Sequence, residues 1–259
     1  GAQISAGQRA APGAIERVRI DPVTYETIFS VVGSNLWSNN KNFQDEIKKT
    51  GITGICGSGI IEAIGEMFLA GIIKSDGSIN GDLQNSTKRV KKDGRTYKFE
   101  ICKNVIIYQN DIRAIQLAKA ALNAGFKLLM KKAKVTDVNK VILAGAFGSH
   151  IDPKYAMILG IVPDCNLENV IAAGNSAGTG ARMALLNINY RKEIEGVVTK
   201  IEKIETAIEQ DFQDFFVDAM AFPHKSDEYN NLKNQVDFSK TIISSKGTNK
   251  SKKRRRKKL

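Results

Sequence analysis

Residues 170–180 read VIAAGNSAGTG, an apolar strand pattern that runs directly into a glycine-rich turn, and this stretch decides the fold class. The same feature occurs at residues 141–148 (VILAGAFG) and at residues 54–59 (GICGSG). Helical patterns follow these turns, so short strands and helices alternate along the chain. This alternation predicts an α/β fold that contains a mixed sheet and flanking helices.

The three glycine turns also indicate a binding site. Glycine permits a positive φ and lets a ligand approach the main chain closely. The unpaired amides in the first turn of the following helix can hold an anion or the polar edge of a ligand, and Ser58 and Thr179 add hydroxyl groups. Together these features suit a nucleotide that lies across the ends of the strands. The alternative interpretation is that each glycine only lets a helix pack tightly against a strand.

The remaining patterns predict two hairpins and three helices. Strands are expected at residues 18–20 and 24–32, and a second hairpin at residues 97–108. The helix after the first glycine turn has an apolar stripe made of Ile60, Ile61, Ile64, Met67 and Phe68. Asn110 or Asp111 caps a long helix with the stripe Ile112, Ile115, Ala118, Leu122, Leu129 and Met130. An amphipathic helix at residues 212–220 is the last one, because apolar periodicity fades after residue 225.

We interpret the notable polar residues outside the glycine turns as structural residues. His150 and Asp152 have the residue types of an acid/base pair, but no third group is identifiable, so we interpret Asp152 as a helix cap. Asp164, in the sequence Val-Pro-Asp, is interpreted as a turn residue. The sequence identifies no catalytic residue and no metal ligands.

The positive charge of the chain is concentrated at its end. The 259 residues include 39 Lys and Arg and 27 Asp and Glu, which gives a formal net charge of +12. Seven of the positive charges lie within residues 252–258 (Lys252 to Lys258), and the rest of the chain carries +5. Such a run is expected to be disordered and solvated. We therefore do not expect nucleic acid as a partner.

Cysteine usage and hydropathy exclude several protein classes. Cys56, Cys102 and Cys165 are widely spaced, which excludes a disulfide scaffold and an iron–sulfur cluster held by this chain alone. Free thiols favour a reducing compartment, and we expect the protein in the cytoplasm. No apolar run reaches about 18 residues, so neither a membrane-spanning helix nor a membrane partner is expected.

Two nucleotide-binding enzyme classes fit the sequence poorly. Gly174, Gly178 and Gly180 match a GxxxGxG turn of dehydrogenases, and Tyr229 and Lys233 form a YxxxK pair. Only 49 positions separate Gly180 from Tyr229, too few for the further strand–helix units that such enzymes need. No GxxxxGK[ST] sequence is present, which excludes a P-loop enzyme.

Several segments resemble the reductive activators of corrinoid proteins, in the order in which that family has them. They are GAQIS at residues 1–5, RAAPGAI at 9–15, ICGSGII at 55–61, NDIR and QLAK within 110–119, AGAFG at 144–148, GNSAGTGA at 174–181, and the closing helix within 211–223. The resemblance covers residues 1–223. Its ordered segments make it far more specific than any single glycine motif.

The resemblance implies both a fold and a function. The fold is the actin-like (ribonuclease H-like) mixed sheet of the acetate and sugar kinase, heat-shock-protein and actin superfamily, in which a nucleotide lies between two lobes. Full-length members carry a [2Fe–2S] domain and use ATP to help reduce a Co(II) corrinoid to Co(I) in a methyltransferase system. The implied ligands are ATP or ADP with Mg²⁺, and the implied partner is a corrinoid protein or corrinoid methyltransferase. The nucleotide-binding residues carried over are Gly57, Ser58, Gly59, Gly145, Ala146, Phe147, Gly148, Gly174, Asn175 and Gly178.

The sequence also departs from the family pattern. The cluster cysteines and the two acidic, Gly-Thr-rich phosphate turns of the family are absent. We therefore expect residues 1–223 to be the C-terminal part of an incomplete two-lobed ATPase domain, inactive by itself, and residues 224–259 to be an extended, mostly disordered basic tail. Two other functions stay open: a kinase-like enzyme of the same superfamily, and a non-catalytic module that docks a corrinoid protein.

Overall fold

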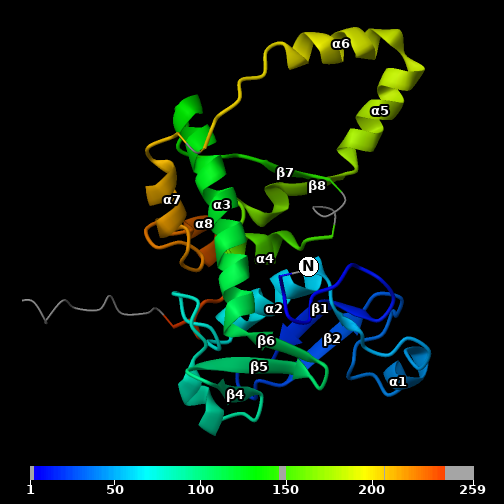
Figure 1. The fold of residues 1–259 in the computed structure, drawn as a ribbon, viewed down its shortest axis with the longest axis vertical. Helices are drawn as coiled ribbons and strands as arrows, with labels where there is room; N and C mark the ends of the chain where they lie inside the picture. Colours follow the sequence, from blue (N-terminus) through cyan, green and yellow to red (C-terminus); the bar gives the residue numbers. More distant parts are fainter. Residues whose placement is uncertain (1–2, 146–149, 207, 243–259) are drawn as a thin grey trace, which may run out of the picture.

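The computed structural model describes residues 3–145, 150–206 and 208–242 (Figure 1). Its strands are β1 (Ala14–Ile20), β2 (Thr27–Val31), β3 (Gly54–Ile55), β4 (Val90–Asp93), β5 (Thr96–Cys102), β6 (Val105–Tyr108), β7 (Val141–Ala144) and β8 (Val170–Gly174). Its α-helices are α1 (Phe43–Glu46), α2 (Gly57–Leu69), α3 (Gln109–Ala133), α4 (Pro153–Ile158), α5 (Ser176–Leu186), α6 (Ile188–Val198), α7 (Phe212–Asp218) and α8 (Asn230–Lys233). Two short 3₁₀ helices, η1 (Gly81–Asn85) and η2 (Leu167–Asn169), complete this set.

The described strands form three small sheets. Their orders are β2-β1-β3, β4-β5-β6 and β7-β8. The first combines an antiparallel pair with a short parallel one, the second is an antiparallel meander, and the third is parallel. Helix α3 runs from the second sheet towards the third (Figure 1). The predicted α/β class with flanking helices is confirmed, with the described strands divided among three sheets.

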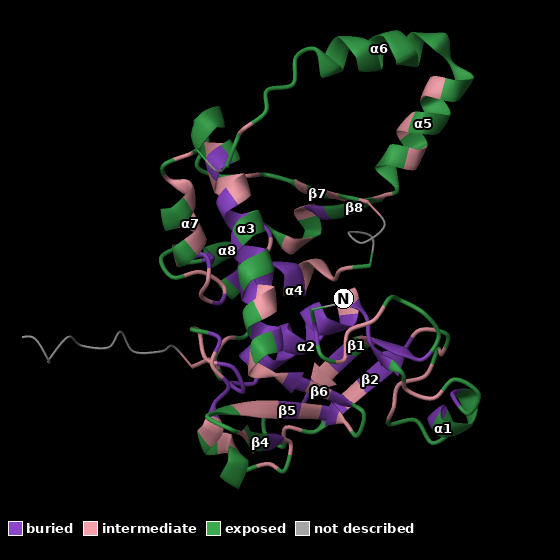
Figure 2. Ribbon diagram, in the orientation of Figure 1, coloured by how far each residue is buried: buried purple, intermediate pink, exposed green. Residues whose placement is uncertain are grey.

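Helix α2 packs on β1 through its predicted apolar stripe. All five stripe residues are buried, and Figure 2 draws most of α2 in purple, the colour of buried residues. Two carboxylates of the same helix are buried as well. Glu62 accepts a hydrogen bond from the Val18 amide (3.1 Å), and Glu66 accepts one from the Ile20 amide (2.9 Å). Because β3 pairs only with the first two residues of β1, these carboxylates complete the hydrogen bonding along the rest of that edge.

The second hairpin and the start of α3 occur where the sequence predicts them, but the cap differs. Tyr108 is the N-cap residue, and Asp111 lies inside the first turn. The Asp111 carboxylate accepts hydrogen bonds from the Tyr108 amide (2.8 Å) and from the amide (2.8 Å) and hydroxyl (3.0 Å) of Ser5. The Asp111 carboxylate therefore stabilises the start of α3 by accepting a hydrogen bond from the N-cap amide. It also holds Ser5, near the first described residue, against the helix.

The buried face of α3 differs from the predicted stripe. Leu122 and Leu129 are 58% and 59% exposed, whereas Gln116, Lys119 and Asn123 are completely or almost completely buried. The reason is that these three polar side chains donate hydrogen bonds to main-chain carbonyls of distant segments, although Oδ1 of Asn123 has no hydrogen-bond partner among the described residues. A periodicity of apolar residues cannot reveal such a face.

The three buried polar side chains bind three separate segments to α3. Gln116 donates to the carbonyls of Met220 (2.6 Å) and Asp76 (3.1 Å), and Asn123 donates to the carbonyl of Gly160 (2.9 Å). Lys119 donates to the carbonyls of Ala221 and Pro223, the second at 2.7 Å. The Lys119 ammonium also lies 5.2 Å from the centroid of the Phe222 ring. Helix α3 thus holds the segment after α7 in place.

The residues after 223 correct the predicted boundary of the tail. Residues 224–242 contain α8, and within them Tyr229, Leu232 and Val236 are buried. Phe238 packs edge-on against Phe68 of α2, with ring centroids 6.3 Å apart. The folded part therefore continues to at least residue 242. The few apolar side chains of this segment are enough to attach it to the core. Residues 243–259, which include the basic run, lie outside the described part.

Burial of Lys119 predicts a specific pH dependence. Desolvation lowers the pKa of this lysine from 10.5 to about 7 in the folded protein. Between pH 7 and 10 the unfolded chain therefore holds a proton that the folded protein does not, so the contribution of Lys119 to the free energy of unfolding rises with pH. We expect the free energy of unfolding to rise less steeply with pH in Lys119→Met. The measurement is urea unfolding of both proteins at pH 7, 8.5 and 10, which gives the difference in their free energies of unfolding at each pH.

The difference between the two proteins is the readout, because other groups also make the free energy of unfolding depend on pH. Burial raises the pKa of Tyr229, for example. Lys119→Met also loses two hydrogen bonds at every pH, which lowers the free energy of unfolding by the same amount at each pH. The lysine proton instead changes how steeply the free energy of unfolding rises with pH. If this rise were equally steep in the wild type and the variant, Lys119 would keep its proton when folded.

Candidate functional site

Two of the three glycine turns lie side by side at the ends of β7 and β8. The strands are parallel, with Ile142 opposite Ile171 and Ala144 opposite Gly174. The amide of Gly145 donates a hydrogen bond to the carbonyl of Gly174 (2.7 Å), which joins the two turns directly. The carboxyl ends of neighbouring parallel strands are where α/β proteins bind ligands. This glycine junction, made of Gly145 and residues 174–178, is the candidate site.

The backbone of the junction requires glycine at two positions. Gly145 has a φ of +111° and Gly174 a φ of +64°. Among the described residues, no heavy atom lies within 4 Å of the position that a Cβ of Gly145 would occupy. The glycine is therefore explained by its backbone conformation, and the adjacent space lets a ligand approach the main chain. The predicted site residues Ala146, Phe147 and Gly148 lie outside the described residues.

Asn175 and Gly178 have a structural task at the start of α5. The Asn175 side chain is the N-cap and accepts a hydrogen bond from the Gly178 amide (3.0 Å). A Cβ on Gly178 would lie 2.7 Å from the Asn175 side-chain nitrogen, so glycine is needed for this cap. The cap orients the first turn of α5 beside the junction. Contact of these two residues with a nucleotide stays a prediction.

The third turn, Gly57 to Gly59, belongs to a different sheet. It forms the first turn of α2, where Cys56 is the N-cap residue and its Sγ lies 3.2 Å from the Ser58 hydroxyl. A Cβ on Gly59 would lie 2.3 Å from the carbonyl oxygen of Ile15 in β1. Close packing of helix on strand thus accounts for Gly59. A nucleotide-binding role for Gly57, Ser58 and Gly59 stays a prediction.

The junction is uncharged, which limits what it can bind. Residues 141–145 and 170–180 contain no Asp, Glu, Lys, Arg or His. The polar groups that these stretches offer to a ligand are uncharged, mainly main-chain amides and carbonyls. Such groups can form hydrogen bonds with the polar edges of a nucleoside. Mg²⁺ needs acidic side chains from outside these two stretches, and within them only uncharged groups, such as the amides that begin α5, could bind a phosphate.

Asp152 has the role that the sequence predicts. Its carboxylate accepts a hydrogen bond from the Lys154 amide (2.9 Å) and caps α4. It also pairs with Arg17 at 3.3 Å, which connects α4 to β1. The partner in this contact is 135 residues away in sequence, so the cap was visible in the local pattern and the ion pair was not.

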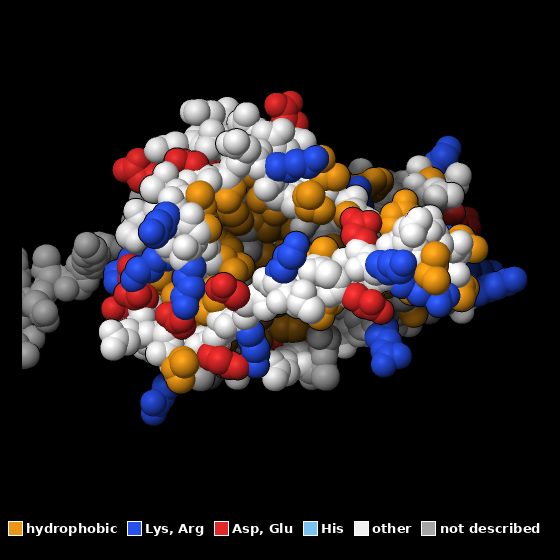
Figure 3. Space-filling model, turned by 90° about the horizontal axis from the view of Figure 1, so that it is seen from above, with side chains coloured by type: hydrophobic (Ala, Val, Ile, Leu, Met, Phe, Trp, Pro, Cys, Tyr) orange, Lys and Arg blue, Asp and Glu red, His pale blue; other side chains and the backbone are white. Residues whose placement is uncertain are grey.

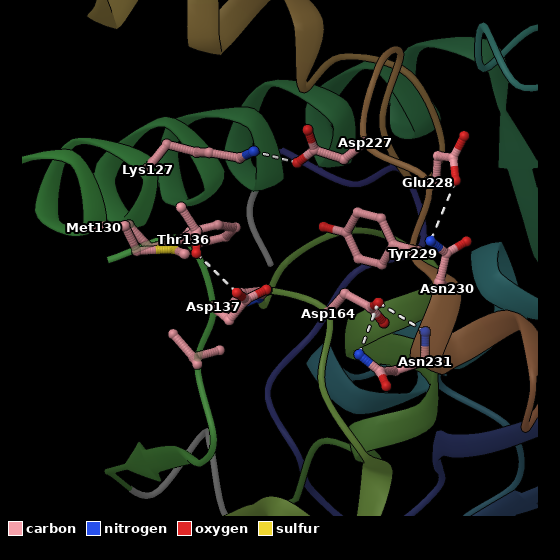
Figure 4. A pocket seen from close by; sticks show the side chains of 13 residues that line it. Lys127, Met130, Thr136, Asp137, Asp164, Asp227, Glu228, Tyr229, Asn230 and Asn231 are labelled. Atoms are coloured by element: carbon pink, nitrogen blue, oxygen red, sulfur yellow. Dashed lines mark hydrogen bonds and ion pairs between the residues drawn. The ribbon is translucent and has the colours of Figure 1, made fainter. Parts of the chain in front are cut away.

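A cavity of about 370 Å³ lies away from the glycine junction, between α3 and α8 (Figure 4). Lys127 of α3 pairs with Asp227 at its wall. Asp164 accepts hydrogen bonds from the amides of Asn231 (2.8 Å) and Leu232 (3.0 Å), which attaches α8. Sequence analysis interprets Asp164 only as a turn residue, since its partners are 67 and 68 residues away. Within the described residues, no group of three His, Cys, Asp or Glu side chains is placed to hold a metal ion.

Comparison with known proteins decides the family. Residues 1–233 match the family described as the C-terminal domain of RACo, the ASKHA domain. The chain belongs to this family. It is also 35% identical over 226 residues to the corrinoid activation enzyme RamQ of Eubacterium limosum, a match that covers 81% of this chain and 34% of RamQ. The recognition of the corrinoid-activator family from sequence segments is thus confirmed.

A solved structure supports the fold of this ASKHA domain. A reductive activator for corrinoid, iron–sulfur protein superposes with a TM-score of 0.73 and 29% sequence identity, over 87% of this chain and 35% of that protein. The chain therefore spans about a third of the length of both relatives. No helix among the described residues is both long enough and apolar enough to cross a membrane.

Proposed function

We propose that this ASKHA domain is the nucleotide-binding part of a reductive activator that uses ATP to help reduce a Co(II) corrinoid to Co(I) in a methyltransferase system. The family match supports the role in corrinoid activation. The glycine junction supports nucleotide binding, because Gly145 and Gly174 are half-buried glycines with positive φ at the ends of two parallel strands. Both relatives are named for corrinoid activation, which favours this function over a kinase-like enzyme.

The residues present fit one side of a nucleotide. The uncharged junction would hold the nucleoside against Gly145 and Gly174, with the first turn of α5 beside it. Mg²⁺ and the phosphates would be held by side chains outside the two turns. The electron that converts Co(II) to Co(I) would come from a [2Fe–2S] domain outside this chain, and a corrinoid protein or methyltransferase in the cytoplasm would be the partner.

Alanine at Gly174 is expected to weaken ATP binding about tenfold. A Cβ at this φ strains the turn by about 1–2 kcal/mol, and relief of that strain distorts the junction. The measurement is the rise in melting temperature on titrating Mg-ATP, because a ligand that binds only the folded form stabilises it. The complete gene product that carries this chain is the sample.

Gly51→Ala is the matched control. Gly51 has a φ of +65°, and among the described residues no heavy atom lies near the position of its Cβ. Its substitution carries the same backbone strain away from the junction, so it should lower the melting temperature without changing the affinity for ATP. Equal loss of affinity in both variants would place the site elsewhere. No melting shift of the unmodified protein at millimolar ATP would support the docking module instead.

A further inference from the structure

The antiparallel meander β4–β5–β6 concentrates positive charge. Residues 86–108 contain seven Lys and Arg and two Asp and Glu, a net charge of +5. Residues 1–85 and 109–242 together contain 23 Lys and Arg and 25 Asp and Glu, a net charge of −2. The meander therefore carries all of the excess positive charge that precedes residue 243.

Four cations of the meander are available to a partner. Lys88, Lys92, Arg95 and Lys103 are exposed, and among the described residues none of them forms an ion pair. The other three basic side chains of the meander each pair with a carboxylate. We define the basic surface as these four exposed residues.

The meander holds the basic surface on a fixed base. Lys92 and Arg95 lie at the turn between β4 and β5, and Lys88 and Lys103 lie at the other end of the same strands, because β4 and β5 are antiparallel. The opposite face of the meander is buried in the core through Val90, Phe99, Ile101, Val105 and Ile107. A surface that is already ordered loses little conformational freedom on binding.

The charge is a local feature of this end of the molecule. Strands β4 and β5 lie at the end opposite α5 and α6 (Figure 1). The view from the end of α5 and α6 shows basic and acidic side chains interspersed (Figure 3). Residues 176–198, which contain both helices, carry three Lys and Arg and two Glu, so their charge is almost balanced.

The meander lacks the aromatic platform on which proteins stack the bases of single-stranded nucleic acids. The Tyr108 ring already faces the Lys98 ammonium, which lies 5.3 Å from its centroid. The Tyr97 ring packs against η1, since a Cβ on Gly81 would lie 2.2 Å from it. Carboxylates are also interspersed in the meander, which disfavours a continuous phosphate backbone.

A lipid surface fits the meander poorly as well. Peripheral membrane binding combines charge attraction with the burial of apolar side chains among the lipids. Within residues 86–108 no large apolar side chain is exposed. Cations that surround a few carboxylates, without open aromatic or apolar groups, instead match a protein face that is rich in Asp and Glu.

We propose that the basic surface is the docking site for an acidic face of the corrinoid protein. This inference rests on the proposed function, which supplies a protein as the partner. Attraction between the two faces speeds their encounter and fixes their orientation. The basic surface contains none of the residues of the glycine junction, so partner binding and nucleotide binding can be measured separately.

The test reverses the charge at one end of the basic surface. Lys92→Glu is combined with Arg95→Glu in the complete gene product. Lys192→Glu with Lys200→Glu, two exposed positions in and just after α6, changes the net charge by the same amount and is the control. The corrinoid proteins of the source organism are purified as probes, and their dissociation constants are measured at low and high salt.

The variant at positions 92 and 95 should bind the partner at least about tenfold more weakly at low salt, and the control within about twofold of the wild type. The difference should shrink at high salt, because ions screen exposed charges. Lys88→Glu with Lys103→Glu, at the other end of the surface, should reproduce the effect. Melting temperatures and their rise with Mg-ATP should match those of the wild type.

Equal partner affinities of the wild type and both meander variants overturn the proposal. Equal losses in the meander variants and the control also overturn it, because only the net charge would then matter. Loss of binding to duplex DNA or to phosphatidylserine vesicles, with binding of the corrinoid protein unchanged, assigns the surface to another partner and overturns it too.

Failure of the proposed function gives a different result. Absence of a melting shift with Mg-ATP in the wild type contradicts nucleotide binding, while the effect of positions 92 and 95 on partner affinity still supports the docking surface. If the wild type binds none of the corrinoid proteins, both the proposed partner and the docking surface are overturned.

Discussion

Replacing Gly59 with alanine is expected to lower the free energy of unfolding by about 3 kcal/mol. The added methyl group would lie 2.3 Å from the Ile15 carbonyl oxygen and 2.9 Å from a side-chain carbon of Ile55. Both neighbours belong to strands that carry the core, so α2 must move away from β1. Its five buried stripe residues would then lose contact with the sheet. Urea unfolding followed by circular dichroism measures the effect.

Gly125→Ala is the control for this experiment. Gly125 also lies within a helix, α3, but among the described residues nothing lies within 4 Å of the position of its Cβ. Alanine there should stabilise the protein by about 0.5–1 kcal/mol, because it only reduces the freedom of the unfolded chain. If both variants behaved alike, close helix packing would not explain the glycine at position 59. A binding role for the turn from Gly57 to Gly59 would then gain support.

Glu62→Gln is expected to destabilise the protein by about 3 kcal/mol. The Glu62 carboxylate, 3% exposed, accepts hydrogen bonds from Arg17 (3.1 Å), Arg19 (2.5 Å) and the Val18 amide (3.1 Å). A neutral amide carries an NH₂ group, so at least one of these three donors would face another donor. The edge of β1 that Glu62 completes would be left partly unsatisfied. Thermal and urea unfolding give the magnitude.

The same substitution at an exposed ion pair provides the comparison. The Glu26 side chain is 67% exposed and pairs with Arg89, whose side chain is 22% exposed. Glu26→Gln should cost less than about 1 kcal/mol, since water solvates position 26 and Arg89 keeps its hydrogen bonds to the carbonyls of Glu100 and Ile101. A cost at position 62 no larger than at position 26 would mean that the strand edge does not depend on the buried carboxylate.

Local patterns predicted those parts of the fold whose determinants lie close together in sequence. The stripe of α2 and the cap at Asp152 each depend on residues within a few positions, so spacing alone reveals them. The buried face of α3 was predicted wrongly because Gln116 and Lys119 are paired with carbonyls more than 100 residues away. Apolar periodicity contains no information about such partners.

The candidate site shows the same division. The strand–turn pattern predicted glycine turns at strand ends, and the structure joins Gly145 to Gly174. The pattern did not separate those turns from Gly59, because a glycine needed for close packing and a glycine needed for a positive φ look identical in sequence. The boundary at residue 223 was wrong because Tyr229, Leu232 and Val236 are separated by polar residues and show no continuous apolar pattern.

The attachment of residues 224–242 determines where the polypeptide can be cut for laboratory use. A gene shortened to end at residue 223 would remove Phe238 from the side of Phe68 and the carbonyl of Ile242 from the amide of Ser75 (2.9 Å). The shortened protein would expose apolar side chains beside α2, and this exposed apolar surface would promote aggregation. A purification tag or fusion partner belongs after residue 242, where the last described bridge, between Ile242 and Lys74, has already formed.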